Sequence, residues 1–194
     1  MEPLARALAR EGFSTLNLPY PSTRLPIPEL VEFINREVEK IASGRPVNFV
    51  THSLGGILAR ALMANSPSWD PGRIVMLAPP HGGSEIVDWS RKHPLIQRFL
   101  GPAGRSLGSD DFPSALPELP ENAQVAVIMG RRRSIPLFKH LLEEDNDGIV
   151  SVSRGNIRGL SAFTVIDADH TFIQMHPEAI RLILGFLKTG ALPA

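Results

Sequence analysis

Apolar residues recur at two spacings along the chain, and these spacings predict its secondary structure. Repeats of three and four residues, typical of helices that bury one side, occupy 4–10, 28–42 and 177–187, and one more helix is expected after residue 55. Short apolar runs, typical of strands, occupy 13–18, 46–50, 73–78, 124–129 and 162–166. Strands that alternate with helices, some of them apolar on both faces, predict a parallel sheet with helices on both sides. We therefore expect one α/β domain across residues 1–194, with a mostly parallel sheet of about five strands.

A long stretch, residues 84–122, separates the third predicted strand (73–78) from the fourth (124–129). It is rich in Pro and Gly but also carries large apolar side chains, among them Trp89 and Phe99. Connections of this length are uncommon unless they have a structure or a function of their own. We interpret the stretch as a short cap or lid-like insertion that contains one or two short helices. Trp89 and Phe99 either contact an apolar ligand or pack the insertion onto the sheet, and the pattern does not separate these two roles.

Composition excludes several kinds of function. The 194 residues include 20 Lys and Arg and 20 Asp and Glu, and this balance argues against nucleic-acid binding, which depends on excess basic residues. The absence of cysteine excludes disulfides, a thiolate nucleophile and cysteine-bound metals. No apolar run is long enough to span a membrane, and the acidic N-terminal residues are unlike a secretory leader. We expect a cytoplasmic protein without stable membrane insertion, unless a leader precedes Met1.

Other charged motifs carry less information. No spacing typical of metal ligands occurs, so neither a metal nor a cofactor is expected. Arg131, Arg132 and Arg133 follow a predicted strand and could grip an anion. In a chain of neutral charge, a solvated basic loop is the simpler interpretation.

The segment Thr51-His-Ser-Leu-Gly55 lies between a buried strand and a helix, and it carries the strongest chemical signal. A tight strand-to-helix turn of this kind exposes a nucleophilic serine, here Ser53, at the carboxyl end of the strand. The N-terminus of the following helix presents backbone N–H groups, and that of Leu54 is the natural donor to a developing oxyanion. Thr51 stands where glycine is usual. The alternative is that Ser53 only caps the helix.

A serine in such a turn needs a base, and His170 has the best position among the six histidines. It follows the last predicted strand directly, in a loop at the carboxyl edge of the sheet, where Ser53 is also expected. His176 is the second choice, because it belongs to the start of the last helix. His52 flanks the serine but is expected to point away from it. An incidental loop histidine is the alternative for His170.

The base needs a carboxylate to orient it, and Asp147 is the preferred candidate. It precedes Gly148 in a loop that follows the fourth predicted strand, and glycine there allows a sharp turn that presents the carboxylate. Asp145 is the main competitor. Asp167 and Asp169 are close to His170 in sequence and are less favoured. A simple Asp-Gly turn without a catalytic role remains the alternative.

The three motifs THSLGG, DNDGIVSV and DADHTFI, in this order, resemble the nucleophile turn, acid loop and histidine loop of small bacterial α/β-hydrolases of the esterase/lipase type. The resemblance extends from Met1 to about Leu187. It implies that a Ser53–Asp147–His170 triad hydrolyses carboxylic esters through an acyl-enzyme, without a cofactor. The implied partner is a small-molecule ester with an apolar acyl group, which Trp89 and Phe99 would contact. An acyltransferase or a thioesterase could use the same triad.

The sequence departs from this family at its start. Such enzymes have a strand that ends in a His-Gly motif before the first helix, and the following loop supplies a second oxyanion donor. Nothing precedes Met1 here, so we expect an N-terminally truncated hydrolase with impaired activity, or an inactive module that binds acyl ligands. His81-Gly-Gly83 echoes the missing motif but follows a different strand, and we interpret it as a turn before a helix capped by Ser84.

Overall fold

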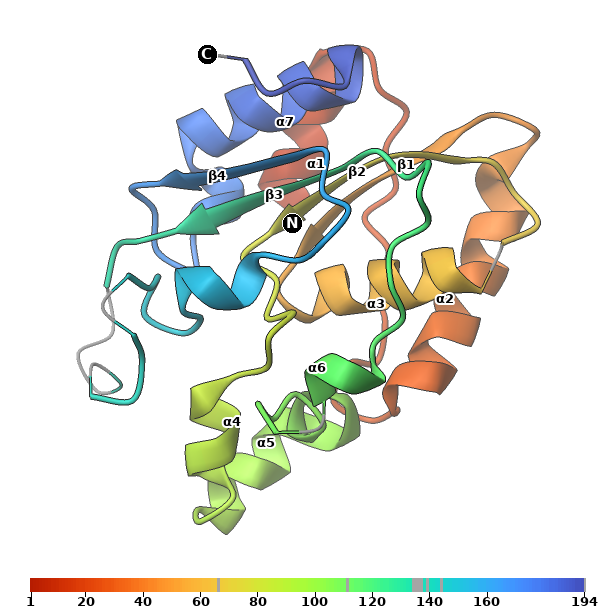
Figure 1. Cartoon of the computed structure of the whole chain (residues 1–194). Helices are drawn as coiled ribbons and strands as arrows, with labels where there is room; N and C mark the ends of the chain where they lie inside the picture. Colours follow the sequence, from red (N-terminus) through yellow and green to blue (C-terminus); the bar gives the residue numbers. More distant parts are fainter. Residues whose placement is uncertain (66, 111, 134–137, 139, 144, 194) are drawn as a thin grey trace.

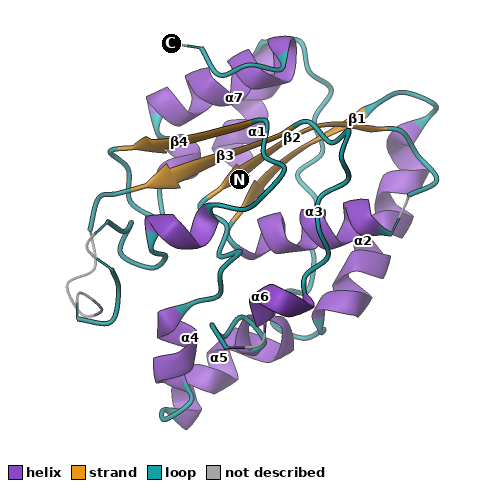
Figure 2. Ribbon diagram, in the orientation of Figure 1, coloured by secondary structure: helices purple, strands orange, loops and turns teal. Residues whose placement is uncertain are grey.

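A parallel sheet lies at the centre of the protein (Figures 1 and 2). The computed structural model describes all residues except 66, 111, 134–137, 139, 144 and 194. In this described part, four strands form the sheet in chain order: β1 (Val47–His52), β2 (Pro71–Leu77), β3 (Val125–Gly130) and β4 (Ala162–Ile166). All neighbouring strands are parallel. Every residue of β3 is buried, which explains why its sequence is apolar on both faces. The predicted α/β class is confirmed.

Helices cover both faces of the sheet. On one face lies α3 (Leu54–Ala64), with α2 (Ile27–Ala42) outside it, and on the other lies α7 (Pro177–Thr189), with α1 (Glu2–Arg10) beside it (Figure 1). Side chains from these helices and the sheet share one core, and two short 3-10 helices, η2 (Val152–Gly155) and η3 (Ile173–Met175), complete this part. Along the described chain, no helix combines the length and the apolarity that crossing a membrane requires.

The buried side of α2 ends at Ala42 and leaves out its apolar neighbour Ile41. Ala42 is buried, whereas Ile41 is 49% exposed. The reason is geometric: steps of four from Leu30 lead through Ile34 and Val38 to Ala42, and Ile41 lies on the neighbouring row.

The segment 13–18 is not a strand, so four of the five predicted strands form the sheet in the described part of the chain. Its backbone turns back along α1, where Phe13 N–H donates to the carbonyl of Leu8 and the Thr15 hydroxyl to that of Ala5. Phe13 and Leu18 pack against the core, whereas Leu16 is 55% exposed. An apolar run becomes a strand only when a neighbouring strand forms hydrogen bonds with it. Here Phe13 and Leu18 pack against the core although no described strand pairs with this segment.

The described part of the insertion at 84–122 forms three helices, where one or two were predicted: α4 (Glu85–Ser90), α5 (Pro94–Arg105) and α6 (Phe112–Ala115). In Figure 1 these helices lie apart from the sheet, on the side of α3. A second, smaller apolar cluster joins them to α3, with Ile57, Val87 and Leu107 buried at its centre. Arg60 of α3 also donates from its Nε to the carbonyl of Pro117, at 2.6 Å. The insertion is therefore packed onto the helix that follows Ser53. Whether it acts as a cap or lid stays a prediction.

Burial in the core predicts that replacing two helical isoleucines by alanine lowers the free energy of unfolding by different amounts. Ile183 of α7 is fully buried, and Ile41 of α2 is half exposed. We expect Ile183→Ala to lower the free energy of unfolding by about 2–5 kcal/mol, because it leaves a cavity against the sheet. Ile41→Ala, the matched control, should change it by no more than about 0.5 kcal/mol. Urea unfolding measures both, and similar values for the two variants would contradict this packing.

Candidate active site

Ser53 occupies a one-residue turn between β1 and α3. Its backbone has φ of 52° and ψ of −121°, which few residues other than glycine adopt. Two hydrogen bonds hold this conformation: Ser53 N–H donates to the carbonyl of Leu77, and the Ser53 carbonyl accepts from Gly56 N–H, both at 2.9 Å. Such strain costs about 1–3 kcal/mol and is typical of functional sites. The Ser53 side chain makes no capping hydrogen bond to α3, which argues against the capping alternative.

Thr51 fits at the position where glycine is usual because Gly55, on the other side of the turn, has no side chain. A Cβ added at Gly55 would lie 3.3 Å from the Thr51 Cβ, closer than about nine in ten contacts of this kind. The absence of a side chain at Gly55 thus accommodates the β-branched threonine. The departure from the family pattern leaves the turn intact.

Asp147 and His170 are hydrogen-bonded to each other. His170 Nδ1–H donates to Asp147 Oδ2 at 2.8 Å, and His170 backbone N–H donates to the Asp147 carbonyl at 3.0 Å. Asp147 is fully buried and His170 is 8% exposed. The other carboxylate oxygen, Oδ1, accepts the N–H groups of Ile149 at 3.0 Å and Val150 at 2.8 Å. Three donors thus satisfy a carboxylate that has lost its contact with water, and its fixed position fixes the imidazole.

The two loops meet because β3 ends in glycine. A Cβ at Gly130 would collide with the Ala168 carbonyl and would lie 3.0 Å from the Asp147 Cβ. Only a residue without a side chain lets the acid loop and the histidine loop approach each other here.

The competing acids and the competing histidine have other surroundings. Asp145 is exposed, Asp167 forms an ion pair with Arg132 at 2.9 Å, and Asp169 accepts N–H groups of its own turn from Thr171 and Phe172. His176 stands at the start of α7, as predicted. None of the four contacts Asp147 or His170 through a side-chain hydrogen bond in the described part of the chain.

His52 is the residue whose role sequence reasoning missed. Its Nε2–H donates to the carbonyl of His170 at 2.8 Å, and the two rings lie with their centroids 4.8 Å apart. Burial, and then the neighbouring His170, lowers the pKa of His52 to about 4, so this ring is neutral at physiological pH. His52 directly precedes Ser53 in the chain, so this hydrogen bond connects the serine turn to the histidine loop. Within the described residues the Ser53 hydroxyl itself makes no hydrogen bond, a common state of such sites before a substrate binds.

The loop after β2 braces the acid loop. Glu85 Oε1 accepts from the Ser151 hydroxyl at 2.9 Å and from Arg154 Nε at 3.3 Å, and Arg154 Nη1 donates to the carbonyl of Gly82 at 2.7 Å. The predicted turn at residues 81–83 and the predicted Ser84 cap are confirmed, since Ser84 Oγ accepts from Val87 N–H. These contacts hold the segment that carries Asp147.

The predicted substrate-contacting residues lie on the helices of the insertion, Trp89 on α4 and Phe99 on α5. Trp89 stacks on His93 with ring centroids 3.9 Å apart, and Phe99 is 81% exposed. One hollow of about 460 Å³ lies along α5, and one of about 230 Å³ lies beside the histidine loop and includes Phe172 and His176. Neither hollow includes Ser53, Trp89 or Phe99.

Charged groups elsewhere match simpler interpretations. Arg131, Arg132 and Arg133 are all exposed, in keeping with a solvated loop. In the part of the chain that the structure describes, no three His, Asp or Glu side chains are grouped closely enough to hold a metal ion.

The architecture is similar to that of known α/β-hydrolases. The mature lipase BlEst2 of Bacillus licheniformis has a TM-score of 0.71 and 17% identity, over 89% of this chain and 77% of the lipase. A metagenomic carboxyl esterase has a TM-score of 0.73 and 19% identity, over 88% of this chain and 58% of the esterase. The phospholipase PlaB from Legionella pneumophila has a TM-score of 0.72 and 16% identity, over 97% of this chain and 56% of the phospholipase.

The chain therefore spans less than two thirds of the esterase and of the phospholipase. No protein-family model matches the sequence, and no curated protein matches it significantly. At identities this low the likeness concerns the fold alone. The chain has the α/β-hydrolase fold, as its motifs predicted.

Two buried neutral histidines predict that acid destabilises the protein. Burial lowers the pKa of His52 to about 4 and, together with the charge of Arg60, that of His81 to about 3. Below pH ~6.5 the unfolded chain binds protons that the folded chain does not, so the free energy of unfolding decreases as the pH is lowered. The loss is about 2 kcal/mol per histidine at pH ~5.

We therefore expect His52→Gln to reduce the loss of stability between neutral pH and pH ~5 by about 2 kcal/mol. His140→Gln, at an exposed histidine, is the control and should leave the loss unchanged. Denaturant unfolding at both pH values measures the difference. An identical loss in the wild type and in His52→Gln would show that His52 titrates normally.

Proposed function

We propose that the protein is a serine hydrolase that cleaves carboxylic esters of apolar acyl groups through an acyl-enzyme. The observation that carries the proposal is the 2.8 Å hydrogen bond between His170 Nδ1 and the buried Asp147, in a loop that also contacts the residue next to Ser53. Nucleophile, acid and base follow one another along the chain in the order that this fold uses. Solved structures of similar fold include a lipase, a carboxyl esterase and a phospholipase, which supports this class of chemistry.

The three triad residues have different tasks. Ser53 Oγ attacks the ester carbonyl while His170 Nε2 accepts the hydroxyl proton, and Asp147 orients the imidazole and stabilises its positive charge. His170 then returns the proton to the leaving alkoxide, so that the alcohol departs and the acyl group stays on Ser53. The same imidazole next removes a proton from water. The hydroxide adds to the acyl carbonyl, the bond from the acyl carbon to Ser53 Oγ breaks, and His170 returns its proton to Oγ as the carboxylic acid leaves.

The oxyanion is stabilised at the N-terminus of α3. Leu54 is the first residue of this helix, so its N–H group has no acceptor within the helix and is free for the substrate oxygen. The positive end of the helix dipole favours the same charge. Each such donor is worth about 10²–10³ in turnover.

The acyl group binds on the side of the insertion. The Leu54 side chain packs with the small apolar cluster around Ile57, Val87 and Leu107, so apolar surface lies directly beside the nucleophile. Trp89, half-buried on α4, is the candidate for contact with the acyl chain. Phe99 is 81% exposed, so the acyl contact is assigned to Trp89 alone.

Ser53→Ala is expected to lower the hydrolysis of p-nitrophenyl butyrate at least ~10³-fold. The melting temperature should stay the same, because the hydroxyl makes no hydrogen bond that folding needs. A fluorophosphonate probe should label Ser53 in the wild type, more slowly in Asp147→Asn, and not at all in Ser53→Ala. Ser106→Ala, at an exposed serine, is the control and should behave as wild type.

Two outcomes would contradict the proposal. Turnover by Ser53→Ala close to that of the wild type would exclude Ser53 as the nucleophile. Labelling of Ser53 without hydrolysis of any ester in a panel of acyl lengths would instead favour an acyl-binding module or an acyltransferase.

His52 is expected to act as a positioning residue. His52→Phe keeps a ring but removes the donor to the His170 carbonyl, and we expect kcat to fall about tenfold while KM stays constant. His52→Gln keeps an N–H donor in nearly the same place and should restore most of kcat. If both variants lose activity equally, the hydrogen bond does not orient His170.

A further inference from the structure

The outer side of α5 exposes large apolar side chains. Leu95 is 77% exposed and Phe99 is 81% exposed, more than any other large apolar side chain in the described part of the chain. They are four residues apart in the regular turns that precede the kink at Gly101, so they are neighbours on one row of the helix. The opposite side of α5 faces the small cluster, where Leu100 packs. The insertion thus holds the helix in place while two apolar side chains point into water.

The same surface is strongly basic. From Trp89 to Ser109 the chain contains four basic residues, Arg91, Lys92, Arg98 and Arg105, and no acidic one, although the whole chain is neutral. Arg91 forms ion pairs with Asp88 and Asp110 at the edge of this surface. Arg98 has no ion pair or hydrogen bond with any described residue, and Arg105 donates only to the carbonyl of Gly101. Most of the positive charge is therefore uncompensated.

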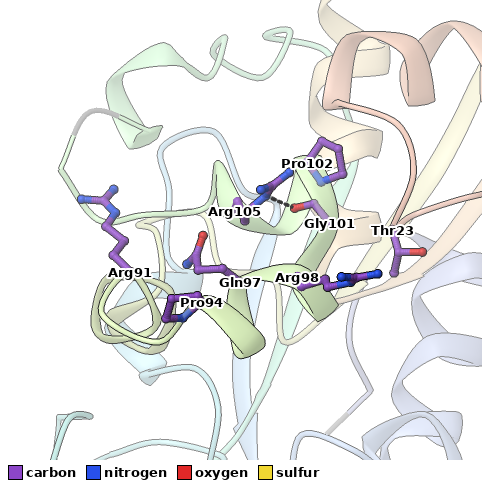
Figure 3. A pocket seen from close by; sticks show the side chains of 8 residues that line it. All are labelled: Thr23, Arg91, Pro94, Gln97, Arg98, Gly101, Pro102 and Arg105. Carbon is purple, nitrogen blue, oxygen red and sulfur yellow. Dashed lines mark hydrogen bonds between the residues drawn. The ribbon is translucent and has the colours of Figure 1, made fainter.

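The arginines lie next to the apolar pair. Arg91, Arg98 and Arg105 line a hollow of about 460 Å³ along α5, together with Thr23 and Gln97, which add further hydrogen-bond donors (Figure 3). In Figure 3, Arg91 and Arg98 lie on opposite sides of this hollow. On the helix, the row that carries Pro94 and Arg98 is adjacent to the row that carries Leu95 and Phe99.

We propose that this face of α5 docks the protein on a negatively charged lipid surface. Leu95 and Phe99 would enter the boundary between headgroups and acyl chains, and the arginines and Lys92 would contact anionic headgroups. A basic row beside an exposed apolar row is the pattern of helices that lie in a membrane interface. The docking is peripheral and needs no helix that spans the membrane.

Charge decides between the possible occupants of this face. A second copy placed face to face would bring two sets of uncompensated arginines together, which opposes association. A nucleic acid would attract the arginines but would leave Leu95 and Phe99 without an apolar environment. An anionic lipid surface satisfies both kinds of group at once.

Vesicle co-sedimentation of the full chain tests the proposal, with phosphatidylcholine vesicles that contain or lack phosphatidylserine. Binding is expected to be at least tenfold stronger to the anionic vesicles and to weaken at high salt, because screening reduces the attraction of the arginines. Arg98→Glu should reduce it at least fivefold. Arg36→Glu, which makes the same change of charge at an exposed site on α2, is the matched control and should bind as wild type.

The apolar contribution is tested separately. The double variant Leu95→Ser/Phe99→Ser should lose at least tenfold in binding without a lower melting temperature, because both side chains are exposed. Ile41→Ser, at the exposed isoleucine of α2, is the control. No vesicle binding, equal binding to neutral and anionic vesicles, or full binding by the double variant would overturn the proposal. So would a concentration-dependent dimer that the double variant abolishes.

This docking does not depend on the chemistry at Ser53. Ser53→Ala should bind vesicles as the wild type does, whether or not the protein hydrolyses esters. Failure of the vesicle test and failure of the proposed hydrolysis are therefore separate results.

Discussion

The hydrogen bond between Asp147 and His170 joins two loops that are 23 residues apart and fixes the geometry of the site. A fully buried carboxylate is costly unless its oxygens are satisfied, and here each oxygen has its own partners. Because Oδ1 is occupied by two backbone N–H groups, only Oδ2 is left for the imidazole. The carboxylate therefore cannot rotate away without losing three donors. This explains how a histidine in a loop keeps one orientation at the rim of the sheet.

The rest of the fold brings these loops together. Parallel strands end at the same edge, so the loops after β1, β3 and β4 converge there. Gly130 permits the close approach of two of them, and His52 connects the third through the carbonyl of His170. The pair formed by Glu85 and Arg154 extends the same support to the loop after β2. The candidate site is thus held by backbone and side-chain contacts from four loops.

Features that depend on chain order and on local pattern could be predicted from the sequence. The turn at Ser53 lies between a clear strand and a clear helix, and the loops of Asp147 and His170 follow β3 and β4 in the chain, so the topology places all three at one edge. Segment 13–18 was wrongly predicted because an apolar run does not reveal whether a neighbouring strand exists. The His52 contact was missed because its partner lies 118 residues away and no local pattern encodes it. The exposure of Phe99 could not be predicted for a similar reason. Contacts with residues distant in the chain, such as Ile57, decide which side of α5 faces the small apolar cluster.

The most direct test of a nucleophilic Ser53 served by the Asp147–His170 pair is a crystal structure of the protein after reaction with a phosphonate ester. We expect phosphorus bonded to Ser53 Oγ, with the phosphoryl oxygen about 3 Å from Leu54 N. We also expect His170 Nε2 within hydrogen-bond distance of the adduct while Nδ1 still contacts Asp147. An adduct on another residue, or an imidazole of His170 turned away from Ser53, would contradict this expectation.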